Sequence, residues 1–415
     1  MVANKPGNRG REIYVLAGLQ LSSWGTSFYT FGLTLIPIEN ELGISRSAAA
    51  LAFPVALLFE GICSVVVGKW IARRLGAHVM ACGSLLCGAG LLVLSQAGSL
   101  LHFHIAWALI GSSFACTLYT PLFSLLAVER PTTYRREVTL ISLITGFSST
   151  LFVPFSGWLM AEVGWRHCVL LYAALNAFCC APGHWFALTA SRQKAISTDG
   201  ALARDPAWTS SQPAPSQPGQ RKLGIYVCLA VFTSAIGAIS AAVAAYLVPI
   251  LMTRGVASEV ALAAPAAIGA LQTLARLPML MRSADAKVHQ LNLILIALFP
   301  VALVLLQTAG TNRALLLAFV VVYGIAHGGW TVVRATSVPQ YLGTRATAVS
   351  NGTIAFWATV GRIALPAFIA FSWAPGEGSE SGGWILLAVA MVGCMSYALA
   401  QRIYFRGLRA RGQVD

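Results

Sequence analysis

The sequence predicts an all-α integral membrane protein, and three observations support that fold class. Hydrophobic residues make up 57% of the chain and charged residues only 10%, with a mean hydropathy of +0.71. Apolar runs recur that are long enough to cross a bilayer, which takes about 20 residues per helix. Lys and Arg gather in alternate connections between these runs, as expected of helices with a fixed orientation. Helices are expected because lipid offers no partner to backbone polar groups.

Twelve segments meet this criterion, six before and six after a polar stretch in the middle of the chain. In order, the expected helices span residues 13–37, 48–70, 77–98, 104–128, 137–161, 167–190, 223–251, 257–281, 289–308, 314–338, 346–372 and 384–405. Every connection except the central one is short, so consecutive helices are expected to be antiparallel neighbours.

The distribution of positive charge predicts the topology. With the N-terminus inside, 21 of the 28 basic residues fall in cytoplasmic connections, four in outer connections and three within helices. An odd number of helices would spoil this separation, so we expect both termini in the cytoplasm and a multi-pass protein of the inner (plasma) membrane. The net charge of +14 then reflects inner loops that meet anionic membrane lipid, and no nucleic-acid partner is expected.

The central polar stretch divides the chain. Residues 191–222 contain four prolines, five serines and no apolar run, so this segment cannot bury enough surface to fold and is expected to be a cytoplasmic linker. It separates an N-terminal six-helix bundle, residues 1–190, from a C-terminal six-helix bundle, residues 223–415. Two such halves indicate an internally repeated transporter with its substrate site near the midplane.

The chain lacks the motifs of several other function classes. The chain has no Gly-x4-Gly-Lys-Ser/Thr loop, no His/Glu zinc motif and no nucleophile elbow, so neither an ATP-driven pump nor an enzyme is expected. The nine cysteines show no paired or metal-ligand spacing, which indicates packing residues and no structural disulfide. No cofactor and no metal are expected.

The loop after the second expected helix carries a family resemblance. It includes Gly68, Arg73 and Gly76 and resembles the loop of the major facilitator superfamily, with Ala72 where the family usually has an Asp that helps latch the outward-facing state. The resemblance implies two six-helix bundles and a conformational role for these three residues. Further similarities lie at Gly146, Pro154 and Gly157 and at the sequence Gly164-Trp165-Arg166.

The second half resembles a narrower branch, the monocarboxylate and oxalate/formate exchangers. The similar segments are residues 246–255 and 269–278. The resemblance implies that Arg276 contacts a substrate carboxylate. Gln272 stands where several relatives have an Asp four residues before this Arg.

Two opposite charges lie near the middle of expected helices, Glu60 in helix 2 and Arg362 in helix 11. An ionisable residue inside a span costs about 2.5–3.5 kcal/mol on insertion scales, so each requires an explanation. In the superfamily architecture these two helices face each other, and a Glu60–Arg362 pair would be a coupling or gating element. The alternatives are that each charge faces water separately or that Glu60 is bonded within its own half.

Two further arginines, Arg276 and Arg334, lie on the cytoplasmic side of their helix centres. They would give a substrate cavity a positive potential, or their long side chains would reach the membrane interface without any function. Arg334 also belongs to a helix 10 face formed by Tyr323, His327 and Trp330. His327 would bind substrate or carry a proton, or it would be a hydrogen-bonded structural residue.

Polar and aromatic residues of the first half complete the predicted substrate-binding set, and the alternative for them is packing. They are Gln20 and Trp24 in helix 1 and Tyr119 in helix 4. The sequence as a whole predicts a monomeric secondary active transporter that works by alternating access. We expect it to carry a small organic anion such as a monocarboxylate, coupled to protons by symport or to a counter-anion by antiport.

Two rival functions stay open. The first is an efflux pump for a neutral or amphipathic toxic compound, such as a drug or a trivalent metalloid, with Cys63 and Cys116 as soft ligands. The second is a membrane sensor or lipid-handling scaffold that no longer transports.

Overall fold

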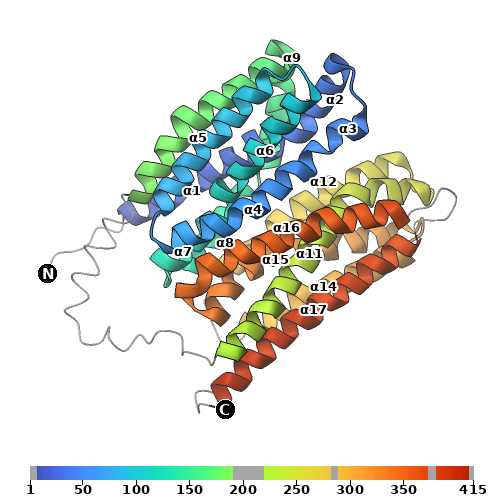
Figure 1. Ribbon diagram of the computed structural model, residues 1–415. Coiled ribbons are helices and arrows are strands. Elements are labelled where there is room, and N and C mark those ends of the chain that lie inside the picture. The colour runs from blue at the N-terminus through green and yellow to red at the C-terminus, as the bar shows by residue number, and fades with distance from the viewer. Residues whose placement is uncertain (1–6, 190–218, 282–287, 373–379, 411–415) are drawn as a thin grey trace. The chain divides into compact units, whose positions relative to one another are not determined.

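The structure is a computed structural model that describes residues 7–189, 219–281, 288–372 and 380–410. Every regular element in these ranges is a helix (Figure 1). The chain forms two compact units. Unit 1 comprises Met1–Pro215 with Thr344–Thr353, and unit 2 comprises Ser216–Gly343 with Ile354–Asp415. Most of the linker expected at 191–222 lies outside the described residues.

Unit 1 is built from helices that the sequence breaks at identifiable points. Its elements are α1 Gly7–Ser23, the π-helix η1 Trp24–Phe28, α2 Thr30–Leu42, α3 Arg46–Ala50, α4 Ala52–Ala72, α5 Gly76–Ser95, α6 Leu100–Thr117, α7 Tyr119–Glu129, α8 Tyr134–Thr145, α9 Ser148–Leu175, the π-helix η2 Asn176–Cys180 and a helical stretch 181–189. Within α9, Gly164 has φ +81° and ψ 157°, a backbone conformation that favours glycine, and the chain kinks there.

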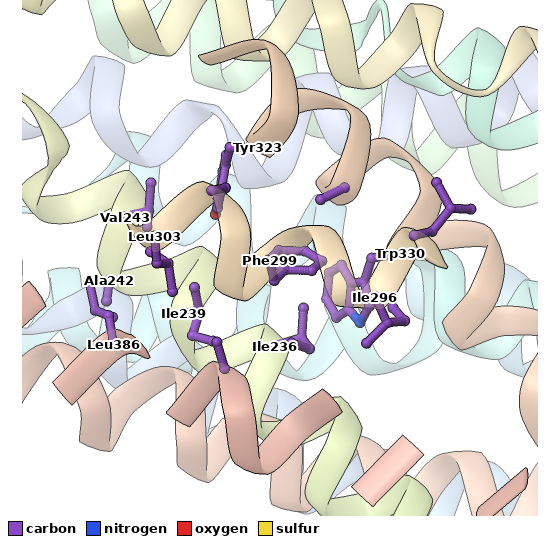
Figure 2. Close-up of a cluster of buried hydrophobic side chains, with 14 of the residues drawn as sticks. Ile236, Ile239, Ala242, Val243, Ile296, Phe299, Leu303, Tyr323, Trp330 and Leu386 are labelled. Atoms are coloured by element: carbon purple, nitrogen blue, oxygen red, sulfur yellow. The ribbon is translucent and has the colours of Figure 1, made fainter. Parts of the chain in front are cut away.

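Unit 2 contains longer, mostly uninterrupted helices. They are α11 Gly219–Thr253, α12 Ser258–Leu274, α13 Leu277–Met281, α14 Val288–Thr308, α15 Arg313–Leu342, α16 Thr344–Ser372, whose first ten residues group with unit 1, and α17 Glu380–Arg409. Its core is a cluster of buried apolar side chains to which every helix from α11 to α17 contributes, and Figure 2 shows part of it. Because lipid is as apolar as these side chains, the helices are held together by close van der Waals packing within the cluster.

Ten helical stretches in the described part of the chain are long and apolar enough to cross a membrane. One of them covers 56 residues, Tyr134–Thr189, and contains the kink at Gly164. The multi-pass, all-helical architecture predicted from hydropathy is therefore confirmed. The count of twelve spans and the cytoplasmic position of both termini stay predictions.

Arg166 of α9 connects α2 with the end of α5 in unit 1. Arg166 donates to the carbonyl oxygens of Ser95 at 2.6 Å and Ala97 at 2.7 Å, at the end of α5. It also binds Glu41 through Nη2 at 2.8 Å and Nε at 3.0 Å. Trp165 Nε1 donates to the same carboxylate at 2.8 Å. Carbonyl groups at a helix C-terminus carry partial negative charge, so a cation is favoured there.

This cluster predicts a pH-dependent contribution to stability. The hydrogen bonds from Arg166, and then from Trp165, hold the pKa of Glu41 below its usual range. Glu41→Gln is therefore expected to lower stability at pH 7 by about 0.5–1 kcal/mol, a small value because the carboxylate is 44% exposed. The stabilisation is complete above the unfolded-state pKa of about 4.3 and is lost as the pH falls through the lowered folded-state value.

Melting temperatures in detergent at pH 7 and at low pH measure this effect. Glu162→Gln removes an exposed acid from the same helix, α9, as Arg166 and serves as the control. If Glu41→Gln melts like the wild type at both pH values, the Glu41–Arg166 pair contributes nothing to stability.

Candidate functional site

Two glycines let α12 and α15 approach closely in unit 2. A Cβ atom added at Gly328 would lie 2.3 Å from the carbonyl oxygen of Gln272 and 3.0 Å from Cβ of Ala275. A Cβ at Gly324, one turn earlier, would lie 2.7 Å from Cβ of Leu271. Small residues at such positions are what allow membrane helices to pack backbone against backbone. The polar residues on the facing sides of α12 and α15 are therefore held in contact.

Arg276 lies at this crossing, between the end of α12 and the start of α13. The residue is buried, with 4% of its surface exposed. Its Nε donates to the carbonyl oxygen of Gly328 at 3.5 Å, and Nη2 donates to Oγ1 of Thr331 at 3.3 Å. These two partners are neutral oxygens, so they orient the guanidinium group towards α15 without changing its charge.

His327 lies on the same turn of α15. Its Nδ1 donates to Oε1 of Gln272 at 2.5 Å, which assigns the ring proton to Nδ1 and leaves Nε2 as the acceptor of the neutral imidazole. Gln272 and Arg276 are four residues apart in sequence, and Gly328 and Thr331 follow His327 within the next turn of α15. The structure thus brings Arg276 and His327 together, as the sequence predicted for the same site.

The other residues of the α15 face form a continuous row with His327. The ring of Tyr323 stacks on His327 at 5.8 Å between centroids, and Trp330 follows at 5.6 Å. Arg334 places its guanidinium carbon 5.6 Å from the centre of the Trp330 ring, within range of a cation–π interaction. Tyr323 and Trp330 are 3% and 9% exposed and lie among apolar side chains (Figure 2), so packing accounts for their burial. Substrate contacts by Tyr323, Trp330 and Arg334 stay predictions.

Gln20 has a structural role in unit 1. The side chain is fully buried, and its Nε2 donates to the carbonyl oxygens of Thr117 and of Leu118, the latter at 3.5 Å. Pro121 has no N–H, so the Thr117 carbonyl lacks the helical donor four residues on. Gln20 therefore satisfies a backbone group at the break between α6 and α7, and its role in substrate binding stays a prediction.

Trp24 and Tyr119 meet beside the same break. Their ring centroids are 5.0 Å apart, and Tyr119 also stacks on Phe123 at 5.0 Å. Trp24 belongs to η1, and π-helical turns of this kind are frequent at functional sites. Both side chains are half-buried. The structure brings the predicted residues of helices 1 and 4 together, and their contact with substrate stays a prediction.

The two central charges lie in different units. Glu60 is half-buried on α4 of unit 1, where its carbonyl oxygen accepts a hydrogen bond from Ser64 at 2.7 Å. Arg362 lies on α16 of unit 2, and its side-chain stem passes 3.7 Å from the Cβ position of Gly237 on α11. The pairing of Glu60 with Arg362 stays a prediction.

The predicted conformational loop is tightly packed at its two glycines. A Cβ at Gly68 would lie 2.5 Å from the carbonyl oxygen of Ala348, and one at Gly76 would lie 2.4 Å from Cδ1 of Leu125. Arg73 is exposed at the end of α4. The two glycines are therefore required for close packing within unit 1, while a conformational role for the loop stays a prediction.

Sequence reasoning did not identify a charged cluster where α1, α7 and α8 meet. Arg130 binds Glu12 at 2.7 Å and Glu137 at 3.4 Å, and Thr133 donates to Glu137 at 2.7 Å. In the sequence, Arg130 is only one of the basic residues expected in the cytoplasmic connections. The available signal was the presence of two acids, Glu12 and Glu137, at the ends of apolar segments that otherwise carry basic residues. Within the described residues, no group of three His, Cys, Asp or Glu side chains could hold a metal ion.

The glycine contact predicts a large effect on the site. Gly328→Val would push α15 away from α12 and displace the oxygen atoms that orient Arg276. We expect uptake to fall about a hundredfold, the order of the loss when reacting or binding groups shift by about 1 Å. Overpacking is expected to cost about 1–3 kcal/mol of stability.

Substrate uptake by reconstituted vesicles, with melting temperature recorded in parallel, checks this expectation. Gly269→Val on α12 is the matched control, because nothing lies within 4 Å of its Cβ position. Wild-type uptake by Gly328→Val would show that the close approach of α12 and α15 does not position the site.

Comparisons with a family model and with individual proteins agree on one family. A sequence model described as "Major Facilitator Superfamily" matches residues 15–366. Monocarboxylate transporter 13 of Rattus norvegicus is 31% identical over 113 residues, which are 26% of this chain and 26% of that protein. Monocarboxylate transporter 11 of Mus musculus is 28% identical over 151 residues, 35% of this chain and 33% of that protein. The chain therefore aligns with about a quarter to a third of the length of these relatives.

Solved structures share the fold. The transporter FucP in the outward conformation superposes with a TM-score of 0.67 at 11% identity, covering 94% of this chain and 98% of that one. The proton:xylose symporter XylE, bound to 6-bromo-6-deoxy-D-glucose, gives 0.64 at 16% identity, covering 92% and 93%.

Proposed function

The chain belongs to the Major Facilitator Superfamily, and on that premise we propose that this membrane transporter carries a small organic anion, such as a monocarboxylate, by secondary active transport. The proposal includes twelve membrane-spanning helices in two bundles, with both termini in the cytoplasm. It places the protein in the inner or plasma membrane, as a monomer that alternates between outward- and inward-facing states. Partial similarity to monocarboxylate transporters 11 and 13 supports the substrate class.

The observation that carries the proposal is the environment of Arg276. Its guanidinium group is buried, oriented by Gly328 and Thr331, and next to the titratable ring of His327. A planar guanidinium with several donors matches the two oxygens of a carboxylate. A charge placed within a membrane domain is expensive and usually functional.

Counterflow in proteoliposomes tests the substrate class. Vesicles loaded with an unlabelled compound are given the labelled one outside, with pyruvate, lactate, butyrate, arsenite and ethidium as the panel. We expect saturable counterflow of at least one monocarboxylate and none of arsenite or ethidium. Counterflow of arsenite or ethidium alone would overturn the proposal in favour of efflux of toxic compounds, in which Cys63 and Cys116 would be the residues to replace first.

A further inference from the structure

The turn between α4 and α5, residues 73–75, contains a backbone conformation that an arginine does not favour. Arg74 has φ +62°, and it is the one residue other than glycine with a positive φ in the described parts of the chain. The other positive φ values there belong to glycines, among them Gly43 and Gly343. A side chain in this region costs free energy, because its Cβ atom crowds the following carbonyl oxygen. Such an outlier is a starting point for a functional hypothesis.

Backbone hydrogen bonds account for the conformation but not for the arginine. The N–H of Arg74 donates to the carbonyl oxygen of Ile71 at 2.9 Å, and the N–H of Leu75 donates to that of Trp70 at 3.1 Å. These two bonds form the Schellman motif, in which the residue after the helix cap is left-handed and is usually glycine. Glycine at this position would make the same bonds without crowding. The reason for an arginine therefore lies in its guanidinium group.

The partial negative charge at the end of α4 does not require Arg74 either. A cation is favoured at a helix C-terminus, but Lys69 already lies in the last turn of α4 and Arg73 is its C-cap residue. Both of these side chains are exposed. A third cation within six residues adds repulsion between like charges, which an anion bound at this place would remove.

Acidic side chains of the neighbouring helices do not balance these three cations. Residues 61–128, which include all of α5 and α6, contain no Asp or Glu. Helix α7 packs against both α4 and α5 and ends with one acid, Glu129. The acids of α1 and α8, Glu12 and Glu137, are bound by Arg130. The α4–α5 turn is therefore a positively charged surface that suits an anionic partner.

The α4–α5 turn also lies where membrane-spanning helices end. Both α4 and α5 belong to helical stretches that are long and apolar enough to cross a membrane, so the three residues between them lie at the boundary of hydrocarbon and water. Trp70 and Leu75 are exposed there. The exposed ring of Trp185 packs edge-on against His78 in the first turn of α5, with 4.6 Å between ring centroids. Tryptophan is enriched at the depth of lipid headgroups.

We propose that the α4–α5 turn binds the headgroup of an anionic phospholipid, with Arg74 on the phosphate and Lys69 and Arg73 adding positive charge. A planar guanidinium donates two parallel hydrogen bonds to phosphate oxygens. In the proposed topology this turn faces the cytoplasm, and the cytoplasmic leaflet carries anionic lipid. The contact offsets the cost of a side chain at a positive φ. The inference goes beyond the proposed function, because it does not depend on which solute is carried.

Arg74→Gly tests the proposal, because it should move stability and lipid binding in opposite directions. The purified protein in detergent is titrated with phosphatidylglycerol, and the melting temperature is recorded at each concentration. Phosphatidylglycerol should raise the melting temperature of the wild type, whereas phosphatidylcholine should not. Without lipid, Arg74→Gly should melt at or above the wild-type temperature, since glycine adopts this φ without strain. It should nevertheless need about fivefold more phosphatidylglycerol for half of the maximal stabilisation.

Two further variants serve as controls for charge and for place. Arg74→Lys keeps the positive charge and should keep most of the affinity for phosphatidylglycerol. Arg136→Gln removes an exposed arginine from the first turn of α8 and lowers the net charge as much as Arg74→Gly does. It should respond to phosphatidylglycerol as the wild type does.

Four results would overturn the proposal. They are a wild type that phosphatidylglycerol does not stabilise, a wild type that phosphatidylcholine stabilises equally, an unchanged affinity in Arg74→Gly, and an equal loss of affinity in Arg136→Gln. Inorganic phosphate is added to the wild type in a parallel titration. Stabilisation by inorganic phosphate at the same concentrations as phosphatidylglycerol would overturn the assignment to a lipid in favour of a free anion.

Discussion

Arg276→Gln is expected to lower monocarboxylate uptake about a hundredfold while expression and melting temperature stay close to those of the wild type. Loss of one partner of a buried charge pair costs about 2–5 kcal/mol, and each 1.4 kcal/mol is about tenfold in affinity. Stability should change little because a glutamine amide retains donors for the oxygens of Gly328 and Thr331, which Arg276 contacts at 3.5 and 3.3 Å.

Two further variants test whether the effect is specific to the guanidinium group at this position. Arg276→Lys keeps the charge but loses the planar pair of donors, so it should retain partial uptake. Arg313→Gln removes an exposed arginine from the start of the same helix α15 and should have no effect. Wild-type uptake by Arg276→Gln would show that this residue does not bind the substrate. The assignment to the Major Facilitator Superfamily would not be affected.

Arg130→Met is expected to produce the largest loss of stability, about 3–5 kcal/mol. Arg130 binds both Glu12 and Glu137, whose side chains are each 11% exposed. Removing the guanidinium leaves two largely buried carboxylates close together without this cation. Because α1, α7 and α8 meet at this point, the melting temperature of the purified protein should fall clearly.

A rescue experiment separates the charge effect from loss of packing. Replacing Glu12 and Glu137 with Gln together with Arg130→Met should recover most of the lost stability, since the uncompensated charges are removed with their partner. Arg136→Met changes an exposed neighbour and should stay within about 0.5 kcal/mol of the wild type. A melting temperature of Arg130→Met equal to that of the wild type would show that the two ion pairs contribute nothing net.

The parts of the fold that hydropathy predicts are those that depend on local composition. Apolar length identified the helices because each span must satisfy its backbone internally. The breaks were not predictable in the same way. Gly164 with its positive φ and the π-helical turns η1 and η2 depend on packing. Asn176 of η2 donates to Thr26 of η1 at 2.8 Å, a contact across 150 residues that no local pattern shows.

In the candidate site, too, some features follow from the local sequence and others depend on packing. Helical periodicity placed Tyr323, His327 and Trp330 on one face, and the structure confirms that their rings form a row. Periodicity cannot tell a cavity wall from a core, and Tyr323 and Trp330 lie in the buried cluster. The bond between Gln272 and His327 could not be read from the sequence, because it depends on the close approach at Gly328.

One residue of the predicted site also serves the backbone. Gln20 was predicted as a substrate contact from its place on a polar stripe, and the structure shows it bonded to the carbonyl of Thr117. The proline that frees this carbonyl, Pro121, lies about 100 residues further along the chain. Only the three-dimensional contact between α1 and the α6–α7 break connects the two observations.

The most direct test of the account is whether the protein recognises the negative charge of its substrate through Arg276. Ligand-induced thermal stabilisation of the purified protein can be measured with pairs of equal shape, such as lactate and lactamide, butyrate and butyramide, and pyruvate and pyruvamide. The account predicts that at least one acid raises the melting temperature of the wild type, that its amide does not, and that Arg276→Gln responds to neither. Equal stabilisation by acid and amide, or an unchanged response to the acid in Arg276→Gln, would contradict it.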